Sequence, residues 1–104
     1  MTLTATSRRG VPIRLTDERW AHIVEEHAEL AGRREELLET ISEAARVLAG
    51  RHGELLAVRA LESDRAFVVV YRETSTEDGF VITAFLTTRM GSLDRREQVW
   101  PPTT

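Results

Sequence analysis

Two polar side chains stand where an apolar residue would pack at lower cost. His27 continues an apolar face that Trp20 and Ile23 begin at helical spacing, and Thr83 lies two residues before Phe85 in a β-type run. A histidine has an unperturbed pKa near ~6.5, so it exchanges protons at neutral pH. A threonine hydroxyl can donate to a phosphate oxygen. Both residues also have an ordinary structural role, as a core histidine and as a good strand residue.

The chemistry that such residues suit is metal-independent cleavage of RNA. His27 or His22 would take the proton of the 2′-hydroxyl. Arginine forks and the Thr83 hydroxyl would stabilise the charge that develops on the phosphorane, and an aromatic ring would stack an unpaired base. The candidate substrate-binding residues are Arg51, Arg59, Arg72, Arg89, Tyr71 and Phe85. No cofactor is expected for this reaction.

The histidines do not have metal-ligand spacing. His22 and His27 are five positions apart, whereas two zinc ligands on one helix face are four apart. His22 and Glu26 have the right separation, but one such pair on an acidic helix is more often solvated than bound to a metal. The sequence also has no cysteine. We therefore expect no metal site.

Length and composition predict one soluble domain spanning 1–104. No apolar run approaches the ~20 residues of a membrane span, so no membrane association is expected. The N-terminus lacks the apolar centre of a secretory signal, which makes a cytoplasmic location the expectation. The net charge is −3, the acids are concentrated in 17–43, and all fourteen basic residues are arginine. This balance argues mildly against bulk attraction to nucleic acid.

Helices are expected in the first half of the chain. Residues 1–10 are polar and predict a flexible arm, and Pro12 makes 11–15 an edge strand at best. Thr16 is a typical N-cap for a helix over 17–29, because acids follow it in the first turn. An apolar stripe that reaches Leu48 predicts a second helix, with Gly50 as its stop. The predicted core covers 11–89, and an extended tail follows over 90–104.

After Gly50 the apolar period changes to two. Residues 54–60, 66–72 and 80–87 are the predicted strands, and the second is expected to be central because it is apolar on both faces. Their short connections require antiparallel pairing. The predicted fold is therefore α+β, with two N-terminal helices packed on one face of a three- to four-stranded antiparallel meander.

Three sequence blocks resemble a known group. The blocks at 19–30 (RWAHIVEEHAEL), 67–73 (FVVVYRE) and 79–89 (GFVITAFLTTR) are similar to small bacterial and phage proteins allied to the barnase, EndoU, colicin and RelE-like (BECR) nucleases. The resemblance implies a toxin-like ribonuclease, with His27 or His22 as acid and base, Thr83 at the phosphate and Phe85 beside it. This chain departs from the group in having no lysine, and in having Ala28 where many relatives have proline.

A second function stays open beside the nuclease. The same fold could be a non-catalytic interaction domain that binds itself or another protein. Its surface would be an exposed strand edge at 55–60 or the tail around Trp100. The expected partners are thus RNA in the first case and a homo-oligomeric partner in the second, with a neutralising protein also expected if the chain is a toxin.

Overall fold

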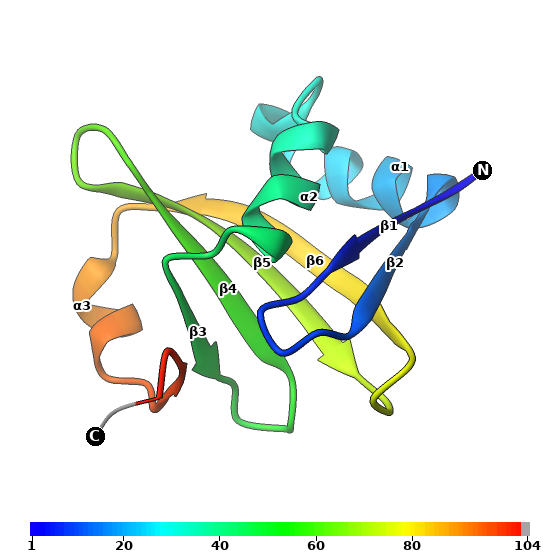
Figure 1. Ribbon diagram of the computed structural model, residues 1–104. Helices are drawn as coiled ribbons and strands as arrows, with labels where there is room; N and C mark the ends of the chain where they lie inside the picture. The colour runs from blue at the N-terminus through cyan, green and yellow to red at the C-terminus, as the bar shows by residue number, and fades with distance from the viewer. Residues whose placement is uncertain (103–104) are drawn as a thin grey trace.

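A computed structural model of the chain describes residues 1–102 and shows a seven-stranded mixed sheet with helices on it (Figure 1). The strands are β1 Thr2–Thr6, β2 Pro12–Thr16, β3 Arg46–Ala49, β4 Leu55–Leu61, β5 Arg65–Glu73, β6 Gly79–Thr87 and β7 Gln98–Trp100. The helices are α1 Asp17–Glu26, the 3₁₀ turn η1 Ala28–Leu30, α2 Arg34–Ser42 and α3 Met90–Asp94. The strand order is β1-β2-β6-β5-β4-β3-β7, which puts β5 at the centre.

The predicted three- to four-stranded antiparallel meander under two N-terminal helices is wrong as a description of the fold. The predicted strands 54–60, 66–72 and 80–87 correspond to β4, β5 and β6, which pair antiparallel in sequence order. Four further strands extend this group on both sides, two of them before the first helix, and one pairing is parallel. The β2–β6 and β3–β7 pairings join segments that are far apart in the sequence, and such pairing has no local sequence signal.

The N-terminal segment forms a hairpin. β1 pairs with β2 antiparallel from Thr2 opposite Thr16 to Thr6 opposite Pro12, and the turn contains Gly10 at a φ of 87°. β2 is not an edge strand, because its other side pairs parallel with Gly79 of β6. Pro12 is tolerated because it is the first residue of the strand. Residues 2–6, predicted to be part of a flexible arm, are thus paired in the sheet.

The second helix is shorter than the apolar stripe predicts. α2 ends at Ser42, and Leu48, the last residue of the predicted stripe, lies in β3. Val47 and Leu48 are both buried but belong to different core clusters, one on each face of the sheet. A single helical face cannot serve two opposite clusters, whereas consecutive strand residues do so naturally. Within 90–102, the predicted extended tail instead contains α3 and β7, and its last two residues lie outside the described part of the chain.

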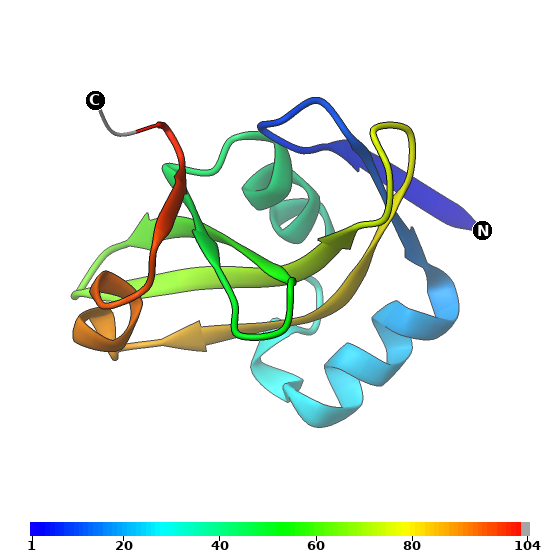
Figure 2. The same ribbon diagram turned by 90° about the horizontal axis from the view of Figure 1, so that it is seen from below.

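The core is divided by the sheet. The helix-covered face carries the larger cluster, including Phe67, Val69 and Tyr71 of β5, Ile23 of α1 and Leu37 of α2. The second face carries a smaller cluster, including Leu48, Leu56, Val58, Val68 and Leu93, with Val70, Phe85 and Met90 only partly buried against it. Figure 2 shows α2 against one face of the twisted sheet and α1 alongside β6. The second face is therefore the less completely covered one.

Thr16 begins α1 as the sequence predicts, since its hydroxyl accepts from the Arg19 backbone N–H at 3.0 Å. β2 pairs with only the first two residues of β6, so the rest of that edge is left to α1. The Arg19 guanidinium donates to the Ile82 carbonyl on β6 at 3.3 Å. Among the residues that the structure describes, no helix is long and apolar enough to cross a membrane.

Replacing Tyr71 with phenylalanine should leave the free energy of unfolding unchanged or raise it by up to about 1 kcal/mol. The Tyr71 side chain is fully buried, and within residues 1–102 its hydroxyl has no hydrogen-bond partner. Burial of the ring therefore stabilises the fold, whereas burial of the unpaired hydroxyl destabilises it. Burial, and secondarily the nearby Glu73 carboxylate, raise the pKa of this phenol. Urea unfolding of Tyr71→Phe measures the effect. A loss of more than about 1 kcal/mol would show that the hydroxyl has a favourable partner.

Candidate functional site

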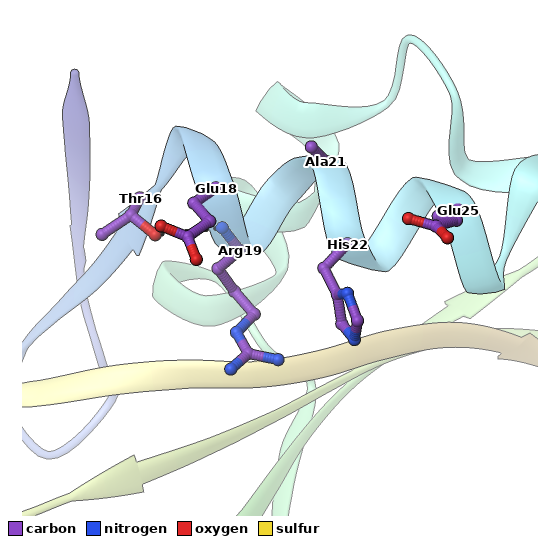
Figure 3. A pocket seen from close by; sticks show the side chains of 6 residues that line it. All are labelled: Thr16, Glu18, Arg19, Ala21, His22 and Glu25. Atoms are coloured by element: carbon purple, nitrogen blue, oxygen red, sulfur yellow. Dashed lines mark hydrogen bonds between the residues drawn. The ribbon is translucent and has the colours of Figure 1, made fainter.

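α1 carries the first of the two candidate histidines. His22 is more than half exposed, and its Nε2 lies 2.8 Å from a Glu26 carboxylate oxygen. It lines an open hollow of about 590 Å³ together with Arg19 and Glu25. Figure 3 shows His22 and Arg19 extending from the same side of α1 toward β6. This hollow contains no aromatic ring besides His22 itself.

His27 lies where α1 ends and its backbone leaves the helical conformation. Its ring centroid is 6.3 Å from that of Phe85 on β6, with the planes tilted by 39°. The His27 side chain is 31% exposed, and its Nδ1 is 3.7 Å from a Glu29 carboxylate oxygen. His27 is therefore neither a fully buried core residue nor a freely solvated one, and it borders the second face of the sheet beside an aromatic ring.

Phe85 also lines a cavity of about 230 Å³ on the second face, which we call the Phe85 cavity. Its apolar wall is Leu56, Val70 and Phe85, and its polar rim is Arg51, His52, Glu54 and Arg96, in which two arginines outnumber one carboxylate. Thr83 is directly opposite Val70 in the β5–β6 register and precedes Phe85 by two residues, so it shares this face. The cavity thus combines an aromatic wall with a cationic rim.

The loop between β3 and β4 positions two members of that rim. Gly53 takes a φ of 88°, which allows the tight reversal. The Glu54 carboxylate accepts from the His52 backbone N–H at 2.8 Å, and this hydrogen bond lowers the pKa of Glu54. The Arg72 guanidinium donates to the His52 carbonyl at 3.0 Å. The loop backbone is held by both contacts, while the side chains of Arg51 and His52 stay exposed.

A second basic cavity adjoins the first. It has a volume of about 440 Å³ and shares Gly50, Arg51 and Arg96 with the Phe85 cavity. Arg95, Ser92 and Glu97 complete its lining together with Ala49. We call it the arginine cavity. It lies beside β3 and the chain segment that leads to β7, at the margin of the sheet.

These arginines differ from most others in the chain. Six of the ten other arginines have an acidic side chain within ion-pair distance, in the pairs Arg9–Glu73, Arg14–Asp78, Arg33–Glu36, Arg34–Asp17, Arg46–Asp94 and Arg59–Glu39. Within residues 1–102, none of Arg51, Arg72, Arg95 and Arg96 makes such a pair; Arg72 and Arg96 instead donate to backbone carbonyls. The second face therefore has positive charge available to an external anion.

The structure brings together some of the predicted site residues. Phe85 and Arg51 line one cavity, Arg72 supports its loop, Thr83 lies on the same face, and His27 is beside Phe85. The sequence did not indicate His52 and Arg96. His52 lies in the connection that the sequence predicts between Gly50 and the strand 54–60, but nothing local indicates that this connection meets Phe85 and Arg96.

Other predicted residues lie elsewhere. Tyr71 is fully buried on the helix-covered face, so no base can stack on it in this structure. Arg59 is opposite Phe67 on that face and pairs with Glu39 of α2 at 3.3 Å. Arg89 is exposed just before α3 and lines neither basic cavity. We therefore leave these three residues out of the candidate site.

Among the described residues, no group of three or more histidine, cysteine, aspartate or glutamate side chains is arranged to hold a metal ion. Comparison with protein-family models, with curated proteins and with solved structures found no match to this chain. The resemblance to the BECR nucleases therefore stays a prediction from the three sequence blocks.

Replacing Arg72 with alanine should loosen the loop that carries Arg51 and His52. The substitution removes a hydrogen bond to the His52 carbonyl worth about 1 kcal/mol, so amide exchange of the loop should quicken by roughly fivefold. Hydrogen exchange followed by NMR measures this. Arg59→Ala is the matched control, because it removes an arginine from the neighbouring strand without touching the loop. Equal exchange in both variants would contradict the proposed support.

Proposed function

We propose that the chain is a small metal-independent ribonuclease that binds single-stranded RNA on the second face of its sheet. The observation that carries this proposal is the position of His27, partly exposed and 6.3 Å from Phe85, next to a cavity whose rim is cationic. An acid–base group, an aromatic platform and phosphate-binding cations are the three groups that this cleavage requires.

The Phe85 cavity suits one base. Its volume of about 230 Å³ is below the roughly 300–1,000 Å³ of most small-molecule pockets, so it favours one flat ring over a larger cofactor. The Phe85 side chain is only partly buried and can stack an unpaired base. A paired base inside a duplex would not reach this wall. The proposed substrate is therefore an unpaired segment of RNA.

The reaction proposed for His27 is an in-line attack within the RNA. His27 takes the proton of a 2′-hydroxyl, and the 2′-oxygen forms a bond to the adjacent phosphorus. The bond from phosphorus to the 5′-oxygen of the next nucleotide breaks, and that oxygen takes a proton from water. The products are a 2′,3′-cyclic phosphate and a 5′-hydroxyl. The Thr83 hydroxyl donates to a phosphorane oxygen as its charge grows.

The geometry gives less support to the interaction domain. Its predicted strand edge at 55–60 is occupied, because β4 pairs with β3 on one side and β5 on the other. Trp100 lies in β7, packs against the helix-covered core and has the Arg8 guanidinium 4.5 Å from its ring centroid. Among the described large apolar side chains, only Met1 is classed as exposed. The predicted edge at 55–60 is therefore closed, whereas Trp100 is partly buried in the edge strand β7.

The proposal is tested by incubating the protein with unstructured RNA in excess chelator. The parent should produce ends with a 2′,3′-cyclic phosphate. His27→Ala should slow cleavage by at least ~100-fold, because a positioned acid–base group contributes about 10²–10⁴. Thr83→Val, which keeps the shape of the side chain, should slow it by about 10-fold or more through the lost hydrogen bond to developing charge.

Two matched variants serve as controls. His22→Ala removes the histidine of the separate hollow on α1, and Arg59→Ala removes an arginine of the helix-covered face. Both should cleave at the parent rate, and circular dichroism should show that all four variants fold. The proposal would be overturned if the parent did not cleave RNA. Cleavage that survived in His27→Ala and disappeared in His22→Ala would refute the assigned site.

A further inference from the structure

We propose that the arginine cavity binds the terminal phosphate of a single-stranded nucleic acid whose adjoining base occupies the Phe85 cavity. This inference rests on the proposed function for the position of the strand, but it concerns binding and not cleavage. It assigns a role to Arg95 and Ser92, which the proposed reaction does not use, and a further one to Arg51, which lines both cavities. The ligand is a phosphomonoester group.

The charge of the cavity fits such a group. Three guanidinium groups, from Arg51, Arg95 and Arg96, face one carboxylate, that of Glu97. The bridging phosphodiester of an RNA chain carries a single negative charge, whereas a phosphomonoester carries about −1.5 to −2 at pH 7. The excess of positive charge in this cavity thus matches a terminal phosphate better than an internal one.

The donors also fit a tetrahedral oxyanion. Guanidinium forks make bidentate hydrogen bonds with phosphate oxygens, and the Ser92 hydroxyl can donate one more. Arg51 and Arg95 are exposed and lack ion pairs within residues 1–102, so their donors are available. Arg96 is partly buried, with its Nη1 3.5 Å from the Ala49 carbonyl oxygen. One fixed and two adjustable guanidinium groups thus surround the same space.

Hydrogen bonds and buried side chains connect the segments that line the arginine cavity. The Ala49 backbone N–H donates to the Glu97 carbonyl at 2.8 Å, which joins β3 to the segment before β7. Leu93 is buried in the cluster of the second face and anchors α3 there. The Glu54 carboxylate lies against Gly50, accepts from the His52 backbone N–H and lines the Phe85 cavity, not the arginine cavity. The cavity is therefore formed by packed elements and not by a loose tail.

The two cavities are adjacent because they share lining residues. Gly50, Arg51 and Arg96 line both of them, so a base against Phe85 has its neighbouring phosphate within reach of the same arginines. The arginine cavity lies at the β3–β7 margin, the last pair in the strand order. Cleavage beside His27 would then take place on the side of β6 that faces α1, away from the arginine cavity. A terminal phosphate in this cavity would set where the chain is cut.

The test is calorimetric titration with unlabelled 2′-O-methyl hexanucleotides, which have no free internal 2′-hydroxyl and cannot be cleaved. Three oligonucleotides are compared: one with a 5′-phosphate, one with a 3′-phosphate and one with hydroxyl groups at both ends. One phosphorylated form should bind at least ~10-fold more tightly than the hydroxyl form, and which one it is identifies the recognised end. Arg51→Gln and Arg95→Gln, both at exposed positions, should each reduce this advantage to less than ~3-fold.

Arg65→Gln is the matched control, since Arg65 is exposed and lines neither basic cavity. It should keep the full preference for the phosphorylated end. Equal affinity for all three oligonucleotides would overturn the inference, and so would a preference that survives in Arg51→Gln and Arg95→Gln. Because these ligands cannot react, failure of the proposed ribonuclease would leave this result unaffected. Conversely, cleavage of RNA without end preference would remove only the terminal phosphate site.

Discussion

The burial of β5 on both faces is the constraint on which the rest of the structure depends. Phe67, Val69 and Tyr71 point into the helix-covered core, and Val68 is buried in the opposite cluster. Each such side chain contributes about 1.5–3 kcal/mol only if water is excluded from it. Both faces therefore need cover. α1, η1 and α2 cover one face, whereas the other has only the short α3, which leaves Val70 and Phe85 partly exposed. The candidate site lies on this second, less completely covered face.

The parallel pairing of β2 with β6 decides which groups reach that site. The pairing involves only Ile13 with Gly79 and Arg14 with Phe80. Beyond it, the edge of β6 is free of strands, and α1 lies along it because the helix begins directly after β2. The end of α1 then brings His27 beside Phe85. A fully paired edge would have excluded the helix, and with it the histidine, from this side of the sheet.

The sequence predicts the elements whose signal is local. β4, β5 and β6 alternate or are apolar throughout, and Thr16 begins α1 with its own hydroxyl, so their positions follow from a few neighbouring residues. β1 is a short alternation of threonine with Leu3 and Ala5 that becomes a strand only through β2. The same distinction holds for the site. His27 and Thr83 are polar residues within apolar patterns, whereas His52 and Arg96 acquire a role only when distant segments meet.

The net charge of −3 does not decide whether this chain can bind a phosphate. Acids are concentrated in 17–43, on α1, η1 and α2, and α1 lies along β6. The arginine cavity is beside β3, three strands from β6, so at about 4.8 Å per strand it is roughly 14 Å from the strand beside α1. α2 packs against β4 and β5 on the helix-covered face, so the sheet separates its acids from the Phe85 cavity on the second face. Exposed charges are screened over about 8 Å at physiological ionic strength. An anion at Arg51, Arg95 and Arg96 therefore responds mainly to those groups. Six of the other eleven arginines are paired with carboxylates, so the proposed phosphate site would depend on this small basic region despite the acidic total.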